Sequence, residues 1–317
     1  MYMSTKQAAQ QWSISERRVR ILCAEGRIDG VIRTGWSWNI PLDAEKPTDG
    51  RQLRHLKNMD MRIGAMNFAS LETKKQEFLS NQKDEHHVML IFRNSVYRFV
   101  LGMFAYEDLH IGNEDLALLF SGCFSPSVPF DTQLLALNTR SVLVRLALEC
   151  GLGSRYKTVQ AKPFYTEKSL ILLYRSLLQG IDDEAALSYR DLEPSEIEKE
   201  GPNLLVATRM EILLRQYEMD WKALHPLVRS LFLFGELLRI HPFGRYDGVF
   251  AFLVLAGELL ASGFPPAFVD IKQVNEFKAA LMLTRTRGNY QNTMRMLEQS
   301  LHHEIALYMR KENTNEI

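Results

Sequence analysis

Apolar positions recur at helical spacing through most of the chain, from about residue 67 to near its end. Apolar residues at positions i, i+3, i+4 and i+7 indicate a helix that buries one face. The pattern predicts helices over residues 135–150, 167–179, 205–218, 225–240, 249–262, 271–284 and 291–309. Gly263, followed closely by two prolines, is a typical stop signal after the fifth of these helices. Residues 67–317 are therefore expected to form an all-helical domain with little strand content.

The first 45 residues follow a different order. Serine and threonine at its start cap a short helix over residues 4–11, and Ser15 caps a second helix that ends at Gly26. Residues 31–41 then have the character of two short strands around a Thr-Gly turn. Two helices followed by a hairpin predict a winged helix-turn-helix over residues 1–45.

Two further segments interrupt the helical pattern. Residues 46–66 are polar, begin with a proline- and glycine-containing stretch and are expected to form a linker. Residues 187–195 lose the helical period, and Gly201-Pro202 precedes the next helix. We expect a short hairpin or flap there, which would include Asp191, Leu192 and Glu193. The fold class is thus mainly α, with a winged unit and a short β-hairpin flap.

Composition narrows the function classes. Hydrophobic residues make up 46% of the 317 residues and charged residues 24%, which is ordinary for a folded globular protein and argues against disorder. The formal net charge is zero, so no overall field draws the protein to nucleic acid or to anionic membranes. Any binding of nucleic acid must come from a local basic patch.

The cysteines and the apolar stretches bear on the compartment. Cys23, Cys123 and Cys150 lack the close spacing of a zinc or redox motif and are expected to be small buried residues in a reducing environment. The N-terminus turns polar at once, unlike a signal peptide. The longest apolar stretch, residues 249–261, contains Glu258 and is too short to cross a bilayer. We expect a cytoplasmic protein of bacterial type with no membrane segment.

The candidate chemistry lies in residues 240–248, between two predicted helices. Pro242 prevents one helix from continuing into the next. A loop that leads into a helix N-terminus presents unpaired N–H groups that favour phosphate, and His241 beside it could act as a general base on a hydroxyl. The alternative is a structural elbow with a capping histidine, which the spacing alone favours.

The surroundings of this loop resemble the Fic family. His225-Pro226-Leu227 and the later Ile240-His241-Pro242-Phe243 are similar to the family's run ahead of its catalytic loop. Further similar pieces lie upstream, in residues 187–190 and 201–210, and downstream, in residues 263–265 and 276–281. The resemblance covers roughly residues 165–310, and its order and spacing are more specific than any single piece.

The resemblance implies a reaction and a cofactor. The family loop reads His-Pro-Phe-x-Asp/Glu-Gly-Asn-Gly-Arg-x-x-Arg. Its histidine deprotonates a hydroxyl of a target protein, and its acid holds Mg²⁺ on the phosphates of ATP. Backbone amides and arginines bind those phosphates, and AMP is transferred. In this chain His241, Pro242 and Phe243 match, and Gly248 keeps the last loop glycine.

The remaining loop positions depart from the family. Arg245 stands in place of the acid, Asp247 in place of the asparagine, and Val249 and Phe252 in place of the two arginines. These losses predict that AMP transfer from ATP with Mg²⁺ is absent or very weak, because each lost electrostatic partner is worth ~10²–10³ in rate. If the site is active, Asp247 is the candidate metal ligand.

The altered loop is nevertheless expected to bind an anion or nucleotide. The candidate binding residues are Phe243, Gly244, Arg245, Asp247 and Gly248. A guanidinium suits phosphate oxygens bidentately. The alternative is that Arg245 pairs internally, with Asp247 or with Glu193 of the flap, and closes the pocket.

Many Fic proteins also carry an inhibitory helix with the pattern Ser/Thr-x-x-x-Glu-Gly/Asn. Residues 103–108 are the best match here and keep only the glutamate, Glu107. The family's glutamate pairs with the second motif arginine, which is Phe252 here. The interpretation that we favour from the sequence is that Glu107 is a solvated helix charge, with an inhibitory role as the alternative.

The first 45 residues resemble excisionase or MerR-type winged DNA readers. Arg17, Arg18 and Arg20 lie on the expected recognition helix, and Arg33 lies in the expected wing. Arginines so placed could reach phosphates and guanine edges. Small winged folds also serve as protein-docking modules, and we favour DNA.

Two function classes follow. The first is a regulatory DNA-binding protein with a degenerate Fic site, which senses or docks an unidentified protein partner. The second is an active Fic-type transferase that moves AMP or another phosphate-containing group from a nucleotide-like donor to a protein hydroxyl. Both function classes are compatible with a homo-oligomer.

Overall fold

The computed structural model describes residues 2–12, 14–24, 28, 30–35, 37–44, 63, 67–80, 85–152, 165–184, 187–191 and 205–309, with the backbone alone at 285–287. Its contacts divide the chain into two compact units, Met1–Met59 and Asp60–Ile317. Residues 46–66, the expected linker, lie outside the described residues except for residue 63. The expected domain bounds therefore stay a prediction.

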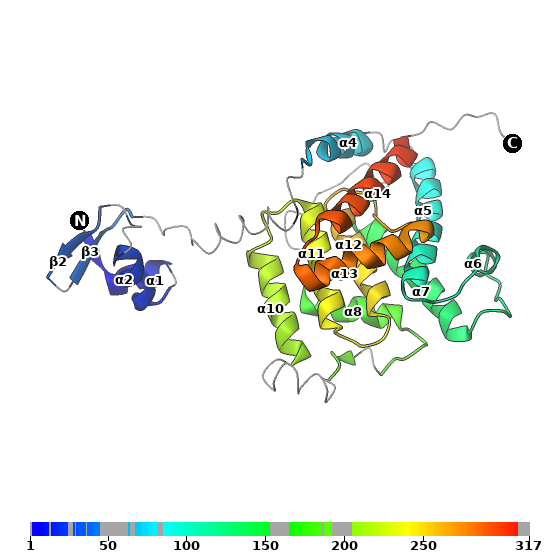
Figure 1. Cartoon of the computed structure of the whole chain (residues 1–317), viewed down its shortest axis with the longest axis horizontal. Coiled ribbons are helices and arrows are strands. Elements are labelled where there is room, and N and C mark those ends of the chain that lie inside the picture. The colour runs from blue at the N-terminus through cyan, green and yellow to red at the C-terminus, as the bar shows by residue number, and fades with distance from the viewer. Residues whose placement is uncertain are drawn as a thin grey trace. The chain divides into compact units, whose positions relative to one another are not determined.

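The N-terminal unit combines two helices with a small sheet (Figure 1). Its elements are β1 Tyr2–Ser4, α1 Thr5–Trp12, α2 Glu16–Ala24, β2 Ile32–Thr34 and β3 Ser37–Pro41. The strands are antiparallel in the order β1-β3-β2, with Met3 opposite Ile40 and Arg33 opposite Trp38. The two helices and the hairpin lie within about two residues of their predicted positions. Strand β1 was not predicted.

The helices of this unit start where their capping residues place them. The Ser4 backbone N–H donates to Gln7 Oε1 at 2.8 Å while the Ser4 hydroxyl accepts from the Gln7 N–H at 3.3 Å. The hydroxyl of Ser15 accepts from the Arg18 N–H at 3.2 Å. The apolar faces that follow meet over one core, formed by Met3, Ala8, Trp12, Val19, Leu22, Cys23, Ile28 and Ile40.

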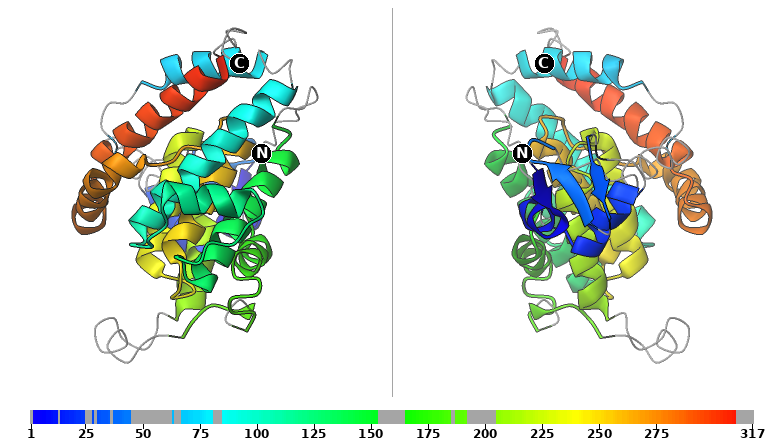
Figure 2. Two further views of the ribbon diagram at one scale, coloured as in Figure 1. Left: turned by 90° about the vertical axis from the view of Figure 1, so that its right-hand side faces the viewer. Right: turned by 90° about the vertical axis from the view of Figure 1, so that its left-hand side faces the viewer.

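The larger unit is a bundle of helices around α12 (Figures 1 and 2). Its helices are α4 Ala69–Ser80, α5 Glu85–Tyr106, α6 Asn113–Phe120, α7 Phe130–Glu149, α8 Glu167–Leu177, α10 Val206–Met219, α11 Pro226–Ile240, α12 Asp247–Ala261, the 3₁₀ turn η2 Ile271–Gln273, α13 Val274–Arg287 and α14 Gln291–Met309. Every residue of α12 from Asp247 to Leu260 is buried, and α11, α7, α8 and α5 pack around it. A helix that is apolar on all sides belongs in the interior.

The helices predicted for residues 135–309 are confirmed, with ends that shift by a few residues. One differs in form, because residues 271–273 make a 3₁₀ turn before α13 begins. The expected hairpin flap has no strand in its described part, residues 187–191. Leu192, Glu193 and Gly201-Pro202 lie outside the described residues.

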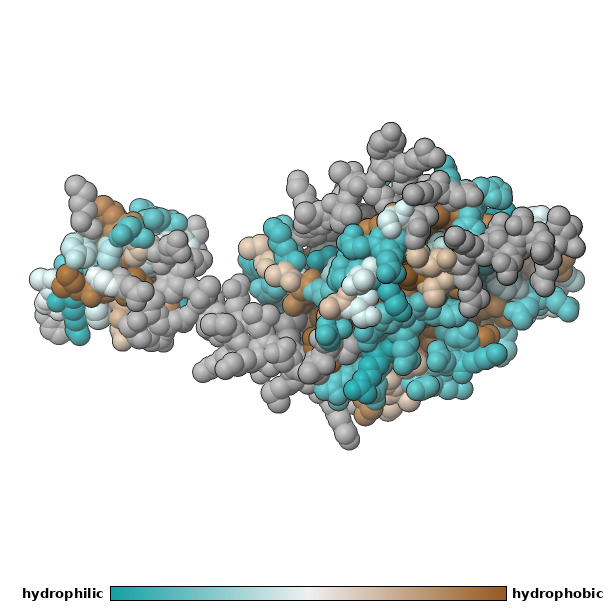
Figure 3. All heavy atoms as spheres, turned by 90° about the horizontal axis from the view of Figure 1, so that it is seen from above, coloured by the Kyte–Doolittle hydropathy of each residue, from teal (hydrophilic) through white to brown (hydrophobic). Residues whose placement is uncertain are grey.

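Helix α5 is the one described helix that is long and apolar enough to cross a membrane by length and composition. More than half of its most apolar window is buried inside the bundle, with Phe92 and Phe99 wholly enclosed. That is the character of a core helix. On the face of the larger unit seen in Figure 3, apolar residues are separated by hydrophilic ones.

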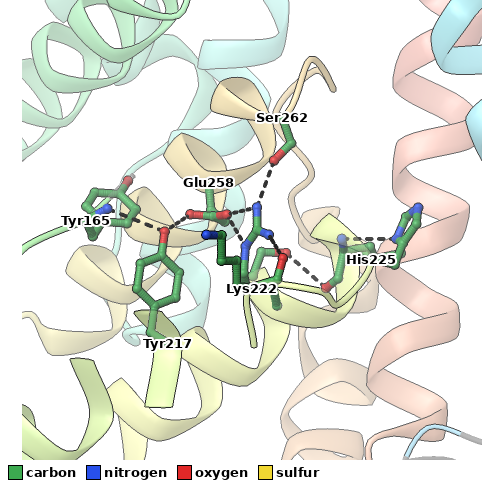
Figure 4. Close-up of polar contacts among 9 residues, drawn as sticks. Tyr165, Tyr217, Lys222, His225, Glu258 and Ser262 are labelled. Carbon is green, nitrogen blue, oxygen red and sulfur yellow. Dashed lines mark hydrogen bonds and ion pairs between the residues drawn. The ribbon is translucent and has the colours of Figure 1, made fainter. Parts of the chain in front are cut away.

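A buried polar network ties α10, α11 and α12 together (Figure 4). Glu258 of α12 is 1% exposed and accepts from Arg229 Nε of α11 at 2.5 Å and from the Tyr217 hydroxyl of α10. Arg229 also reaches the Ser262 hydroxyl at 3.3 Å. Burying a carboxylate is costly unless it is paired and hydrogen-bonded, and this one is both. The network fixes the C-terminal part of α12 against the N-terminal part of α11.

His225 begins α11 and joins it to α4. Its Nδ1 accepts from the Leu227 N–H at 3.2 Å, while its Nε2 lies 3.0 Å from Glu72 Oε1. The Phe68 ring stacks on the imidazole at 4.1 Å. Since Nδ1 accepts, the neutral ring carries its proton on Nε2 and donates it to Glu72. Burial lowers the pKa of His225, against the opposing effect of Glu72.

Candidate active site

The loop between α11 and α12 is built on left-handed backbone positions. His241 ends α11 at φ 50° and ψ 65°, and Tyr246 precedes α12 at φ 54° and ψ 28°. Side-chain-bearing residues there cost of order 1–3 kcal/mol each and are concentrated at functional sites. Gly244 has φ 83°, and a Cβ on it would lie 3.1 Å from Arg190 Cδ. Glycine is favoured at this position by its left-handed backbone, and any larger residue would also have to displace the Arg190 side chain slightly.

Residues of the segment before α10 and of α8 hold the loop carbonyls. The Arg190 backbone N–H donates to the Pro242 carbonyl at 2.9 Å, and its Nε donates to the His241 carbonyl at 2.6 Å. The Tyr174 hydroxyl donates to the Arg245 carbonyl at 2.8 Å. Burial raises the pKa of Tyr174, which keeps this donor neutral. The loop is thus fixed through its backbone.

Asp247 closes the loop from the inside. It is 4% exposed, and its two oxygens accept from the Phe243 N–H at 3.2 Å and the Gly244 N–H at 2.7 Å. Its Oδ2 also lies 3.6 Å from His241 Nδ1. The N–H groups of Phe243 and Gly244, which were predicted to bind a phosphate, therefore donate to the protein's own carboxylate. In the part of the chain that the structure describes, no cluster of three or more metal-ligating side chains includes it.

Arg245 points to a partner that the sequence did not predict. Its Nη2 lies 3.0 Å from Asp131 Oδ2 at the start of α7 and 3.0 Å from the Tyr246 hydroxyl. The guanidinium also sits 4.8 Å from the centre of the Tyr246 ring. Among the described residues, the alternative to anion binding is found, an internal ion pair of Arg245, and its partner is Asp131. The ion pair is about half exposed.

The two positions at which the resemblance would place arginines lie in the core. Val249 and Phe252 are 0% and 1% exposed. Phe252 packs against Tyr106 at 5.3 Å and Phe234 at 4.8 Å between ring centres. Phe243 is buried likewise, stacked on Tyr174 at 3.7 Å, so it offers a ligand its backbone only.

Glu107, at the end of α5, lies against the first turn of α12. The Gly248 N–H donates to its carboxylate, and a Cβ on Gly248 would fall 1.7 Å from Glu107 Oε1. Burial raises the pKa of Glu107, and the hydrogen bond from Gly248 opposes that rise. The interpretation of Glu107 as a solvated helix charge is therefore wrong. Its carboxylate occupies the helix N-terminus, where an anion would otherwise be favoured.

A cleft of about 710 Å³ opens beside these groups. Glu107, His241 and Lys278 line it, together with Leu238, Leu281 and Met282. The His241 side chain is 45% exposed, so its imidazole is accessible from the cleft. Lys278 Nζ pairs with Asp108 Oδ1 at 2.7 Å. The structure thus brings His241 together with two carboxylates, those of Asp247 and Glu107.

The remaining candidate residues lie elsewhere. In the flap, Asp191 is exposed and its carbonyl accepts from Arg190 Nη1 at 3.1 Å. In the N-terminal unit, Arg17 is exposed on α2, Arg18 is half-buried, and Arg20 pairs with Glu16 at 2.6 Å. Arg33 lies 5.3 Å over the Trp38 ring in the hairpin.

The sequence missed Asp131, Tyr174 and Arg190 as parts of the site. Arg190 had a signal, because it lies in residues 187–190, one of the pieces that resemble the Fic family. Asp131 and Tyr174 had none, since each meets the loop only through the fold.

No family model matches the chain, and no curated protein is similar to it in sequence. Solved structures are similar in fold. Fic-1 from C. elegans (residues 134–508) aligns with a TM-score of 0.64 at 18% identity, over 82% of this chain and 74% of that one. A Fic-domain-containing signaling protein from Bacteroides thetaiotaomicron aligns with a TM-score of 0.56 at 16% identity, over 74% of this chain and 98% of that one.

These similarities define the class of fold. The chain is mainly α and has a Fic-type fold, as the sequence predicted. At identities this low they establish the fold and leave the chemistry to the residues of the loop.

Proposed function

We propose that this protein is a DNA-binding Fic-fold regulator whose loop does not carry out AMP transfer from ATP with Mg²⁺. One observation carries the second half of this proposal: the groups expected to bind phosphate are engaged by the protein itself. Asp247 takes the amides of Phe243 and Gly244, and Glu107 takes the amide of Gly248. Arg245 is paired with Asp131.

Electrostatics supports the same conclusion. A nucleotide phosphate at this loop would face the carboxylates of Asp247 and Glu107 without a motif arginine beside them. Like charges at such separations disfavour each other, and a preorganised site needs donors aimed at the phosphate. Both oxygens of Asp247, the candidate metal ligand, already accept hydrogen bonds from the loop.

The test is transfer of labelled AMP. Full-length protein with labelled ATP, Mg²⁺ or Mn²⁺ and a cell lysate should give no labelled product above that of the His241→Ala variant. The comparison uses equal amounts of folded protein, checked by melting temperature. Robust labelling that depends on His241 would overturn the proposal.

The DNA-binding half of the proposal rests on the N-terminal unit. Its two helices and hairpin follow the winged helix-turn-helix order, and α2 carries Arg17, Arg18 and Arg20. Arg17 and Arg20 are exposed, and Arg20 is partly neutralised by Glu16 at 2.6 Å. We therefore expect Arg17 to contribute more to phosphate binding than Arg20.

Selection of duplexes from a random library tests this half. Bound duplexes should share a sequence, and affinity should fall with salt because phosphate contacts release counterions. The triple change of Arg17, Arg18 and Arg20 to alanine should weaken binding at least ~10-fold and flatten the salt dependence. The matched control changes three exposed arginines of the larger unit, Arg93, Arg175 and Arg215. Equal binding by the two triple variants would contradict the proposal.

The second candidate function is a transferase with a different donor. The half-exposed His241, in a left-handed conformation at a cleft of about 710 Å³, favours it. The oxygen of a protein hydroxyl would attack a phosphorus of a nucleotide-like donor, AMP or another phosphate-containing group would be attached, and the rest of the donor would leave as the phosphorus–oxygen bond to it breaks. His241 would take the hydroxyl proton. A panel of labelled nucleoside triphosphates and nucleotide conjugates distinguishes the two. Label transfer from any of them that is lost in His241→Ala supports this candidate.

A further inference from the structure

The cleft beside His241 carries an unbalanced negative charge. Within the described residues, Lys278 pairs with Asp108 at 2.7 Å and Arg239 with Glu236 at 2.6 Å, so these lining cations are already neutralised. Among the residues that the structure describes, the hydrogen bond that Glu107 accepts comes from the neutral Gly248 amide. A carboxylate has room for about four hydrogen bonds, and this one is left under-satisfied in a half-buried position.

We propose that this cleft binds the guanidinium group of an arginine-like ligand, with Glu107 as its carboxylate partner. The inference rests on the proposed function in one respect, that the protein's own carboxylates exclude the nucleotide phosphate. It goes further by assigning the opposite charge to the ligand.

The lining of the cleft fits the rest of an arginine side chain. Leu238, Leu281 and Met282 give apolar surface for an aliphatic stem, which long cationic side chains bury while keeping the charged head on a polar partner. The volume of about 710 Å³ lies within the usual range for ligand sites. Of the carboxylates that line the cleft, Glu107 has no ion-pair partner among the described residues, and the charged end of such a stem would lie against it.

Geometry favours a guanidinium over an ammonium. A guanidinium donates two parallel N–H groups to the two oxygens of one carboxylate, and it is more weakly hydrated than an ammonium. Glu107 already accepts from the Gly248 amide, and the remaining lone pairs on its two oxygens suit a two-pronged donor. An ammonium would use one of them and lose more hydration.

The ligand could be a free small molecule or an arginine residue of a protein. Four probes separate these sources: L-arginine, N-acetyl-arginine amide, the blocked tripeptide Gly-Arg-Gly, and its Gly-Lys-Gly counterpart. Each is titrated calorimetrically into the full-length protein at neutral pH. We expect the blocked arginine probes to bind at least ~10-fold more tightly than the lysine peptide. Binding by L-arginine alone would assign the source as the free amino acid and keep the site.

The decisive variant is Glu107→Gln, which keeps the shape and the acceptor for the Gly248 amide but removes the charge. It should reduce affinity for the arginine probes at least ~10-fold. Glu276→Gln removes the same charge from an exposed position of α13 and should leave affinity unchanged. Affinity should also fall as the pH is lowered through the raised pKa of Glu107, because the ligand needs the ionised form.

Three results would overturn the inference: no binding of any arginine probe, equal affinity in wild type and Glu107→Gln, or equal affinity for the arginine and lysine peptides. Absence of arginine binding together with absence of AMP labelling would remove the inference and leave the proposed function standing. Labelling that depends on His241 would remove the proposed function, whatever the arginine probes do.

Discussion

At the scale of single residues, the loop between α11 and α12 is organised by side chains that form hydrogen bonds with its backbone groups. Asp247 takes two amides, Glu107 takes one, and Arg190 and Tyr174 hold the carbonyls. Such contacts place the imidazole of His241 by fixing the backbone on both sides of it. Apart from Asp247, the residues that hold the loop backbone lie far from it in the sequence.

Gly248 gives the sharpest prediction at this scale. Replacing a helix glycine with alanine usually stabilises a protein by up to ~1 kcal/mol. Here the new Cβ would fall 1.7 Å from Glu107 Oε1 and 2.9 Å from Tyr106 Cε1. We expect Gly248→Ala to lower the free energy of unfolding by about 1–3 kcal/mol, measured by urea denaturation.

The control for this prediction is the same substitution in a Glu107→Ala background. Removing the carboxylate opens the closer of the two contacts, so the cost of Gly248→Ala should shrink there. An equal cost in both backgrounds would show that Glu107 does not press on Gly248.

The sequence predicted some of these residues and could not have predicted others. His241, Phe243 and Gly248 follow from motif order, because their roles depend on neighbours in the loop. Arg245 was assigned to a ligand, although its partner Asp131 lies 114 positions away. Glu107 was interpreted as a solvated charge, since nothing local shows that α5 ends against α12. The spacing of residues along the sequence therefore could not predict which side chains meet across the fold.

At the scale of elements, the spacing of apolar residues predicted helices correctly where a helix was long. The helices from α7 to α14 follow the predicted ranges because each has several turns of apolar repeats. Strand β1 is three residues long with only Met3 buried, which is too short for an alternating pattern to show. The flap stays a prediction, because only residues 187–191 of the expected interval are described and they contain no strand.

The network that joins α10, α11 and α12 predicts a large effect of one substitution. Glu258→Gln leaves Arg229 without its buried counter-ion, and breaking a buried pair costs about 3–5 kcal/mol. Glu236→Gln is the matched control, because Glu236 pairs with the half-exposed Arg239 and such pairs are worth about 0–1 kcal/mol. Denaturant titration of both variants measures the difference, and similar costs would contradict the assigned role.

The junction between α4 and α11 predicts a pH dependence. The folded pKa of His225 is lowered by burial, so below its unfolded value of about 6.5 the unfolded chain takes up a proton more readily. The contribution of His225 is therefore fully present above that pH and is lost as the pH falls toward the lowered folded pKa. Protonation also places a hydrogen on Nδ1, which faces the Leu227 N–H.

His225→Asn tests this, since asparagine keeps an acceptor for the Leu227 N–H but does not titrate. The wild type should lose more stability than the variant between pH 7.5 and pH 5, with both measured by urea denaturation. If the stabilities of the two proteins change with pH in the same way, His225 does not cause the pH dependence of stability.

At the scale of the whole molecule, two units with separate cores share one chain. The described core of the N-terminal unit contains residues of that unit alone and includes Trp12, which is 6% exposed. Trp12→Ala should cost about 3–5 kcal/mol, enough to unfold a unit of this size. Hydrogen exchange should show loss of protection in residues 2–44 and none in α11 and α12. Loss of protection in both would mean that the units fold as one.

The burial of Phe252 also bears on directed evolution. An arginine at this position would have to displace a ring that packs with Tyr106, Phe234 and Phe277. Libraries that vary the loop alone should therefore yield few folded clones with arginine at position 252. An arginine at position 252 would first require a smaller residue at one of those three aromatic positions, before any selection for catalysis. In this protein the order in which substitutions accumulate decides which chemistries a lineage can reach.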